Sequence, residues 1–279
     1  MGVALVRYIE QYQPKETRLF DDEIVKYFLP GSYVKLLKIR FIRNWVIRTA
    51  DKITKGIYDG LNCRTEYIDR TTHLISENNI QQVLILGSGL DTRPYRLEEL
   101  KKVKVFEVDL AWVQDLKKQK LIKHFGSLPE NIKYVSIDFN HQALNEVLQQ
   151  HNFNFSEPVF MIWEGVTQYI TKDAVEKTLD FVSKTAKGSY LVFTYVLESV
   201  IKRESLIEGA NEFADSLVRK KTPWIFGMEK DNVGSFIKNY NLKLLSNFKA
   251  SDYQNEHINK AGRQLQISEI ERIVIARVE

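Results

Sequence analysis

The chain has 279 residues, a formal net charge of +4 and 27% charged residues. Its content of 44% hydrophobic and 11% aromatic residues is typical of a globular protein, and its length is sufficient for one large domain with a sizeable core. The single cysteine, Cys63, excludes an internal disulfide framework, and no apolar stretch reaches the roughly 18 residues needed to span a bilayer.

The first 78 residues have a helical pattern, with helices predicted over residues 21–28, 32–58 and 62–77. The start of the chain lacks a basic region before an apolar core, so we expect no secretion leader and a soluble, cytoplasmic protein. Residues 35–48 interleave basic with apolar side chains. Such a helix can bind a nucleic acid, a membrane surface or an acidic molecule, but it more often packs its apolar stripe on its own domain. We therefore expect no nucleic-acid and no membrane partner.

An apolar strand is predicted at residues 82–86, and it runs into a glycine turn that ends at Asp91. An uninterrupted apolar run is typical of a strand buried on both faces. Gly87 and Gly89 permit a turn whose backbone can touch a ligand without an intervening Cβ. The third glycine of a dinucleotide fingerprint is absent, so the turn favours a ligand other than a pyrophosphate.

Carboxylates follow the next predicted strands. The strand at residues 103–108 ends at Asp109, that at 132–137 ends at Asp138 and Phe139, and that at 158–163 ends at Glu164. Ligands of open α/β sheets bind outside the carboxyl ends of the strands, and an acid after the second strand binds ribose hydroxyls. We predict this role for Asp109, and we predict that Asp138 and Phe139 contact an adenine base.

The rest of the chain continues the alternation of strands and helices. Helices are predicted at residues 112–125, 143–151, 172–185 and 233–240, and further strands at 189–196, 242–248 and 271–278. Right-handed crossovers make such a sheet parallel, whereas the last two strands suit an antiparallel pair at the sheet edge. The predicted fold is α/β, a doubly wound, mostly parallel, seven-stranded sheet with an antiparallel last strand.

Four segments stand in a distinctive order: residues 63–69 (CRTEYID), 86–97 (LGSGLDTRPYRL), 106–110 (FEVDL) and 163–169 (WEGVTQY). With residues 18–22 they resemble the leucine carboxyl methyltransferase family, including its bacterial branch of small-molecule O-methyltransferases. These are class I enzymes that use S-adenosyl-L-methionine and release S-adenosyl-L-homocysteine. The resemblance covers most of residues 1–200. The helical pattern of residues 1–78 predicts a cap or lid, and the alternation that follows predicts a Rossmann-like cofactor-binding domain at 79–279, with a lid insertion at about 200–230.

The resemblance also implies site residues. Arg64 matches the family's arginine, and an arginine fork suits the carboxylate of the cofactor. Glu164 matches the family's acid near the methionyl end of the cofactor, and Tyr169 matches a family tyrosine. Arg64 and Tyr169 are the candidate catalytic residues, because either could orient the acceptor. The predicted cofactor-binding residues are Arg64, Gly87, Ser88, Gly89, Asp91, Asp109, Leu110, Asp138, Phe139 and Glu164.

The chemistry of the acceptor narrows the prediction. Methyl transfer from a sulfonium requires alignment and exclusion of water but no metal, and no metal site is predicted because the histidines are scattered. A carboxylate is already ionised at pH 7 and needs no general base, whereas a hydroxyl acceptor needs one. No histidine stands at a motif position, so a carboxylate of a small molecule or peptide is favoured.

Three alternatives stay open: methylation of a hydroxyl group, an NAD-dependent oxidoreductase, and a non-catalytic cofactor-binding protein. Aromatic residues of the cap and the insertion, namely Trp45, Tyr58 and residues 223–226, suit a flat or apolar acceptor, although core packing is the commoner role of such residues. The oligomeric state does not follow from the sequence.

Overall fold

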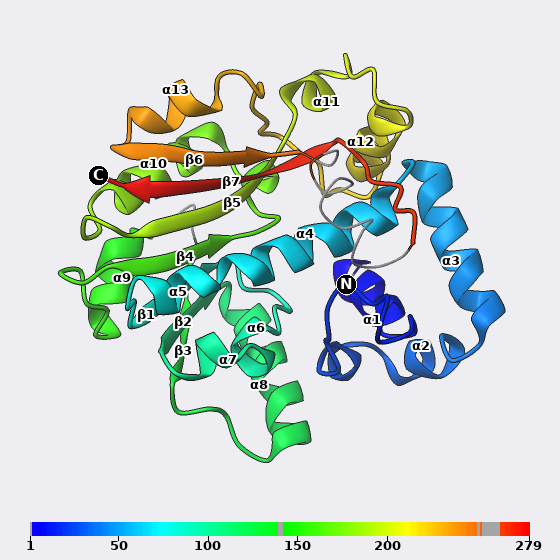
Figure 1. Ribbon diagram of the computed structural model, residues 1–279, viewed down its shortest axis with the longest axis horizontal. Coiled ribbons are helices and arrows are strands. Elements are labelled where there is room, and N and C mark those ends of the chain that lie inside the picture. Colours follow the sequence, from blue (N-terminus) through cyan, green and yellow to red (C-terminus); the bar gives the residue numbers. More distant parts are fainter. Residues whose placement is uncertain (1, 139–141, 250–251, 253–262) are drawn as a thin grey trace.

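A seven-stranded sheet forms the centre of the molecule, with helices on both faces (Figure 1). The computed structural model describes residues 2–138, 142–249, 252 and 263–279. The strands are β1 (Gln82–Leu86), β2 (Lys104–Asp109), β3 (Ile132–Ser136), β4 (Val159–Trp163), β5 (Tyr190–Val196), β6 (Leu242–Phe248) and β7 (Glu271–Val278). Their order across the sheet is β3-β2-β1-β4-β5-β7-β6.

Helices fill the connections between the strands. Before β1 lie α1 (Gly2–Glu10), the 3₁₀ helix η1 (Val25–Phe28), α2 (Gly31–Leu36), α3 (Arg40–Ile53), α4 (Ile57–Thr71) and α5 (His73–Glu77). Between β1 and β5 lie α6 (Arg93–Arg96), α7 (Glu98–Lys101), α8 (Ala111–Phe125), α9 (Leu144–Gln150), η2 (Thr167–Tyr169) and α10 (Lys172–Ser183). After β5 lie α11 (Glu198–Lys202), α12 (Ala210–Arg219) and α13 (Val233–Lys238).

The apolar run of β1 is explained by burial on two sides. Leu84 and Leu86 belong to a core cluster that also contains residues of α9, α10 and α13. Val83 and Ile85 belong to a second cluster with residues of α4, α5 and α7. Because successive side chains of a strand point to opposite faces, a strand covered on both faces needs apolar residues at every position.

All seven predicted strands are present, and their ends differ from prediction by at most a few residues. The strands β1 to β5 pair in parallel, whereas β7 runs antiparallel to both β5 and β6 and lies between them. The predicted antiparallel last strand is therefore confirmed. The order of the strands changes direction between β1 and β4, and this switch point opens a crevice at the carboxyl ends of the strands.

The predicted helices before β1 are partly wrong. The single helix expected at residues 32–58 is divided into α2, α3 and the start of α4, because Ile39 is extended and Gly56 has a φ of +75°. The carbonyl oxygen of Gly56 accepts a hydrogen bond from the amide of Ser268 at 3.0 Å, and a Cβ on Gly56 would lie 2.7 Å from the carbonyl oxygen of Gln266. This contact with a distant segment stops the helix, and local sequence does not reveal it.

Two further predicted helices have different bounds in the structure. Only Val25–Phe28 of the expected helix at residues 21–28 is helical, as 3₁₀ helix η1. Asp22 instead accepts hydrogen bonds from the amide of Val25 at 3.1 Å and from the hydroxyl of Thr92 at 2.8 Å. The expected helix at 62–77 begins earlier, at Ile57, and divides at Thr72 into α4 and α5.

Within the described ranges, none of the helices is both long enough and apolar enough to cross a bilayer. The two aromatic residues singled out in the cap have different environments. Tyr58 is buried and donates its hydroxyl to Glu10 at 3.2 Å, whereas Trp45 is exposed on α3. Tyr58 is thus a core residue.

Candidate functional site

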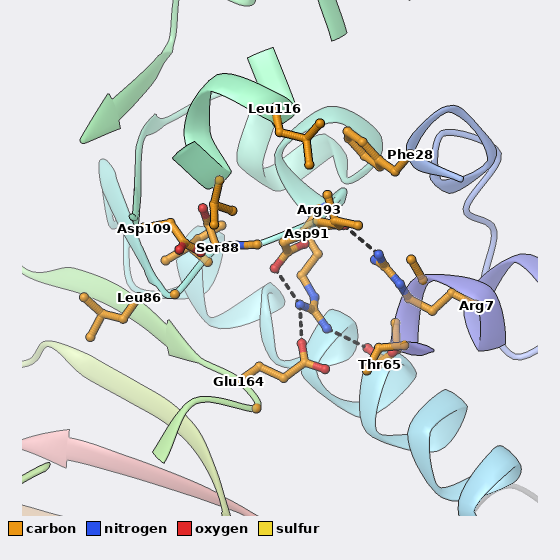
Figure 2. A pocket seen from close by; sticks show the side chains of 18 of the residues that line it. Arg7, Phe28, Thr65, Leu86, Ser88, Asp91, Arg93, Asp109, Leu116 and Glu164 are labelled. Atoms are coloured by element: carbon orange, nitrogen blue, oxygen red, sulfur yellow. Dashed lines mark hydrogen bonds and ion pairs between the residues drawn. The ribbon is translucent and has the colours of Figure 1, made fainter. Parts of the chain in front are cut away.

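A cavity of about 720 Å³ lies at the carboxyl ends of β1, β2 and β4 (Figure 2). Its walls come from the turn after β1, the first half of α8, the loop after β4, and the helical segments α1 and α4. Phe28 and Leu116 approach each other across its outer part, and Glu164 lies at the opposite side (Figure 2). The volume lies within the range of sites for small molecules and cofactors.

The turn after β1 adopts the conformation that its glycines permit. Gly87 has a φ of +68° and Gly89 a φ of +42°, and the amides of Gly87 and Ser88 donate to the carbonyl of Val108 at 2.8 and 3.0 Å. A Cβ on Gly87 would overlap the side chain of Val166. Glycine is required at this position, and the backbone of the turn borders the cavity directly.

Asp109 at the end of β2 holds this turn. Its Oδ2 accepts the amide of Gly89 at 2.6 Å, and its Oδ1 accepts the amide of Leu110 at 2.7 Å. Burial raises the pKa of Asp109 above its usual value, and the two amides act in the opposite direction. The carboxylate therefore joins the turn after β1 to the start of α8 and faces the cavity, as the sequence predicts for an acid that binds ribose.

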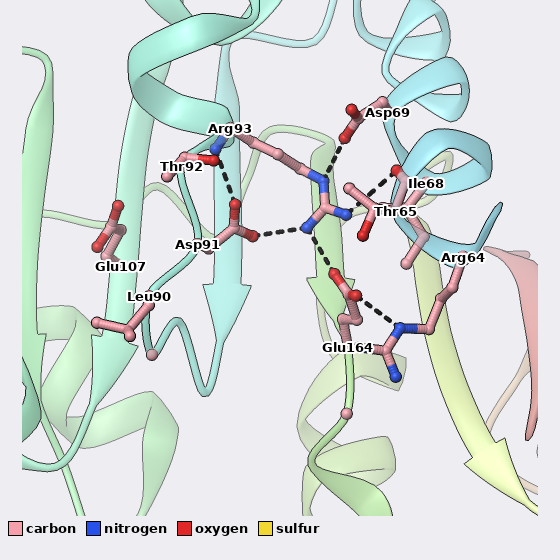
Figure 3. A network of polar contacts seen from close by, with 12 residues as sticks. Arg64, Thr65, Ile68, Asp69, Leu90, Asp91, Thr92, Arg93, Glu107 and Glu164 are labelled. Atoms are coloured by element: carbon pink, nitrogen blue, oxygen red, sulfur yellow. Dashed lines mark hydrogen bonds and ion pairs between the residues drawn. The ribbon is translucent and has the colours of Figure 1, made fainter. Parts of the chain in front are cut away.

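Arg93 is the centre of a buried polar network (Figure 3). Its Nε donates to Asp69 at 2.7 Å, and its Nη1 donates to Asp91 at 2.7 Å and to Glu164 at 2.6 Å. Arg93 is 1% exposed, and its Nη2 also donates to the carbonyl of Thr65 at 3.4 Å. It connects α4, the turn after β1 and the loop after β4. No role for Arg93 follows from the sequence motif, which shows only an arginine where a third glycine would stand.

Arg64 binds the same acid from the other side. Its Nε donates to Oε1 of Glu164 at 2.7 Å, and its Nη1 donates to Glu271 at 2.5 Å. The guanidinium lies beside Gly165, where a Cβ would be 3.8 Å from both of its terminal nitrogens. The structure thus brings Arg64 and Glu164 together in the wall of the cavity. Glu271, from the start of β7, is a partner that spacing along the chain does not indicate.

The arginines of the network keep its buried carboxylates ionised. Burial by itself would raise the pKa of Asp91, but Arg93, Lys117 and other positive charges outweigh it and lower the pKa to about 2. Burial would likewise raise the pKa of Glu164, and Arg93 together with Arg64 lowers it below its usual range. Both carboxylates are therefore ionised at neutral pH and are weak proton acceptors.

A second buried pair lies behind the glycine turn. The ammonium of Lys117 on α8 and the carboxylate of Glu107 on β2 lie 2.6 Å apart, and both side chains are fully buried. Gln114, one turn before Lys117, donates to the carbonyl of Glu107 at 2.8 Å and lies 3.5 Å from the hydroxyl of Ser88. These contacts fix α8 against β2 and hold Ser88 in the wall of the cavity.

The N-terminal helix closes another side of the cavity. Arg7 of α1 donates to the carbonyl of Leu90 at 2.6 Å and to the hydroxyl of Thr92 at 3.1 Å, and it pairs with Asp22 at 3.2 Å. Arg7 therefore attaches the cap to the turn after β1. Its role is absent from the sequence predictions because these contacts join segments that are far apart in the chain.

The structure places the predicted site residues in two groups. Those that line the cavity are Arg64, Gly87, Ser88, Gly89, Asp91, Asp109 and Glu164. Leu110, Asp138 and Tyr169 are not part of its lining, and Phe139 lies outside the described residues. Asp138 follows β3, where its amide donates to the side chain of Gln142 at 2.9 Å, and Tyr169 is 47% exposed on η2. Ligand contacts of these four residues stay predictions.

Among the described residues, no group of three or more histidine, cysteine, aspartate or glutamate side chains is arranged to hold a metal ion.

Curated relatives match about half of the chain. A proposed S-adenosyl-L-methionine-dependent methyltransferase of Mycobacteroides abscessus is 32% identical over 155 residues, which are 54% of this chain and 51% of the relative. A similar protein of Mycobacterium tuberculosis is 32% identical over 146 residues, covering 52% of this chain and 47% of the relative. The chain thus spans about half the length of the curated relatives it matches.

Solved structures resemble the whole fold. A crystal structure of a DUF574 family protein from Streptomyces avermitilis has a TM-score of 0.65 at 14% identity and covers 100% of this chain and 97% of that chain. A proposed methyltransferase from Thermobifida fusca has a TM-score of 0.59 at 16% identity, and the match covers 85% of this chain and 88% of that chain. The likeness concerns the fold, and it agrees with the predicted seven-stranded, mostly parallel α/β sheet.

The family model for leucine carboxyl methyltransferase matches residues 1–183. This range is more than half of the chain, and it contains all the described residues that line the cavity. The chain therefore belongs to the leucine carboxyl methyltransferase family.

Proposed function

We propose that this protein is an S-adenosyl-L-methionine-dependent O-methyltransferase that methylates a carboxylate of a small molecule or peptide. The observation that carries the proposal is the cavity at the sheet switch point, where the glycine turn and Asp109 meet. Family membership and the description of the relatives support it.

The residues present fit this cofactor. Each oxygen of Asp109 accepts one amide and has a second lone pair, which suits the two ribose hydroxyls. The hydrogen bonds of Arg64 to described residues use Nε and Nη1, which leaves the Nη2 donors for the cofactor carboxylate. The positive φ of Gly87 and Gly89 brings backbone, without a Cβ, to the wall between these two groups.

When bound, S-adenosyl-L-methionine supplies an electrophilic methyl group on a sulfonium. The chain's part is to hold the acceptor oxygen in line with that methyl group and to exclude water. The cap contributes to exclusion, because α1 covers the cavity and Arg7 ties it to the turn. We propose that Arg64 and Tyr169 orient the acceptor carboxylate.

The charges around the cavity favour a carboxylate over a hydroxyl acceptor. No histidine is among the described residues that line the cavity. Asp91 and Glu164 are paired with arginines, and their pKa values are lowered, so neither is suited to remove a hydroxyl proton at neutral pH. A carboxylate acceptor needs only orienting donors.

Binding titrations test the cofactor. We expect S-adenosyl-L-methionine and S-adenosyl-L-homocysteine to bind in calorimetry and NAD not to bind. Arg64→Ala and the charge-conserving Arg64→Lys should both weaken binding, because neither can pair with Glu164 and Glu271 and still present Nη2 donors to the cofactor. Arg219→Ala, an exposed change, is the matched control. Binding of NAD alone would favour an oxidoreductase, and binding of none of the three would refute the proposal.

A chemical test then separates the acceptor classes. After incubation with S-adenosyl-L-methionine carrying a labelled methyl group and a set of carboxylic acids and phenols, the products are treated with mild alkali. A methyl ester releases labelled methanol, whereas a methyl ether retains its label. Labelled products that resist alkali would replace the carboxylate proposal with hydroxyl methylation. Cofactor binding without any labelled product would favour the non-catalytic alternative.

A further inference from the structure

A surface of mixed basic and apolar character covers α2, α3 and the turn between them, at the right-hand edge of the molecule (Figure 1). We call it the basic-aromatic patch. Its exposed apolar side chains are Tyr33, Leu36, Ile39, Phe41 and Trp45. Its exposed basic side chains are Lys35, Lys38, Arg40, Arg48 and Lys52. None of these ten residues lines the cavity.

The helix α3 has apolar residues on two sides. Ile42, Val46 and Ile47 are half-buried and pack against the N-terminal core cluster. Phe41 and Trp45 are 78% and 60% exposed, on the opposite side. The spacing predicts that the apolar stripe of this segment packs on its own domain, and the structure shows that this holds for the inner side only.

The outer side of α3 combines aromatic and cationic residues. Phe41, Trp45, Arg48 and Lys52 follow one another at intervals of four, three and four positions, so they form one stripe along the helix. Ile39, in the turn before α3, is 53% exposed and extends the apolar part of the stripe.

The charge of the patch has one sign. Residues 31–53 contain a single acid, Asp51, which is half-buried. Arg43 does not add to the exposed charge, because it donates to the carbonyls of Leu37 and Lys38 at 2.6 and 2.8 Å and covers the ring of Tyr12. The exposed cations therefore present a net positive surface beside exposed aromatic rings.

We propose that the basic-aromatic patch binds an anionic lipid surface. Aromatic and aliphatic side chains enter the boundary between headgroups and acyl chains, and lysines and arginines attract the anionic headgroups. Both kinds of residue lie on one face, so α2 and α3 can lie flat on a bilayer. This differs from the sequence expectation of no membrane partner, because the exposure of Phe41 and Trp45 is decided by tertiary packing.

Two other occupants agree less well with the patch. A symmetric contact with a second copy would bring the same cations of both chains together, which costs electrostatic energy. A nucleic acid would use the cations and could stack on the aromatic rings, but it gives no reason for the exposure of the aliphatic Leu36 and Ile39.

Vesicle sedimentation tests the inference on the full chain without cofactor or acceptor, so its outcome is independent of the proposed function. We expect the protein to sediment with vesicles of phosphatidylcholine containing about one third phosphatidylserine, and not with phosphatidylcholine alone. Phe41→Ser/Trp45→Ser and Lys38→Glu/Arg40→Glu should each lower the partition coefficient at least about tenfold, the latter because each cation contributes roughly fivefold.

Control variants change exposed residues elsewhere on the surface. Leu206→Ser/Leu245→Ser and Lys133→Glu/Lys187→Glu should sediment like the wild type. Circular dichroism verifies folding, and the single change Phe41→Ser replaces any double variant that fails to fold. Equal binding of patch variants and wild type, or no binding to anionic vesicles, refutes the inference. If the wild type does not bind vesicles but forms a dimer that the patch variants lose, the patch is a contact with a second copy and the inference is refuted. If it does not bind vesicles but binds a nucleic acid that the patch variants do not bind, the inference is refuted in favour of a nucleic acid.

Discussion

Arg93 and Glu164 meet through Nη1 and Oε2 at 2.6 Å, and this contact joins the turn after β1 to the loop after β4. The other oxygen of Glu164 is held by Arg64 at 2.7 Å. Glu164 is thus clamped between two buried arginines (Figure 3). Because the two loops flank the switch point of the sheet, the clamp sets the width of the cavity between them.

Replacement of Arg93 should be strongly destabilising. Arg93→Ala would leave Asp69, Asp91 and Glu164 as buried acids without their shared cation, and we expect a loss of about 3–5 kcal/mol in the free energy of unfolding. Arg93→Lys keeps the charge but not the fork and should cost less. Urea denaturation measures both. Lys177→Ala removes an exposed partner of Asp173 and should change stability by at most about 1 kcal/mol. A loss of similar size for Arg93→Ala and Lys177→Ala would contradict the role of the network.

The same network predicts an acid-labile contribution to stability. The pKa of Asp91 is about 2 in the folded chain and about 3.9 in an unfolded one, so its ionisation stabilises the fold above pH 4. This stabilisation, about 2–3 kcal/mol, is lost as the pH falls from 4 through 2, because the proton then binds both states. Glu164, with its pKa also lowered, adds to the loss in the same direction.

Comparison with Asp91→Asn isolates this effect. We expect the wild type to be more stable than the variant at pH 6, and the difference in unfolding free energy to shrink as the pH falls below 4. Denaturation curves measured at intervals from pH 6 to pH 2 provide the data. A difference that stays constant over this range would show that the charge of Asp91 contributes nothing.

Substitutions of Glu107 and Lys117 should have non-additive effects on the free energy of unfolding. Lys117→Met leaves the Glu107 carboxylate buried without its cation, and we expect a cost of about 3–5 kcal/mol. Glu107→Gln/Lys117→Met removes both charges and should cost less than Lys117→Met, because no uncompensated charge remains. Unfolding free energies of the two single variants and the double variant complete the cycle. Additive costs would mean that the two side chains do not interact.

Asp109 should contribute to cofactor binding in addition to holding the turn after β1. Asp109→Ala would remove the hydrogen bonds to the ribose hydroxyls of S-adenosyl-L-homocysteine. Because a hydrogen bond to a charged group contributes about 1.5–3 kcal/mol, we expect the affinity for this ligand to fall at least about tenfold. Asp109→Asn keeps one oxygen acceptor and should lose less. Calorimetric titration gives both values, with the exposed Asp173→Ala as the control. Unchanged affinity of Asp109→Ala would remove ribose binding from its functions.

Strand positions were predictable because they depend on local pattern. The run from Val83 to Leu86 is apolar at every position, and burial on both faces of a parallel sheet requires such a composition. The helices before β1 were less predictable, since the break at Gly56 depends on contact with Gln266 and Ser268, which are far away in the chain. Hydrophobic periodicity cannot show where such a contact stops a helix.

The site followed the same division. Glycines and acids at strand ends marked Gly87, Gly89 and Asp109, because the topology of an open α/β sheet brings these ends to one edge. The roles of Arg93 and Arg7 were not predicted, because the role of an arginine depends on the carboxylates and carbonyls that folding places around it.

The sequence by itself determined the strand positions, the glycine turn after the first of them and the resemblance to the family, because burial of apolar strands and the conformational freedom of glycine are local requirements. Only the tertiary structure decided which charges meet and which apolar residues stay exposed. Glu271 reaches Arg64 because β7 pairs beside β5, and Trp45 stays exposed because the other side of α3 packs on the cap. Both outcomes depend on contacts between segments that are far apart in the chain, and the pattern of residues along one segment does not reveal such contacts.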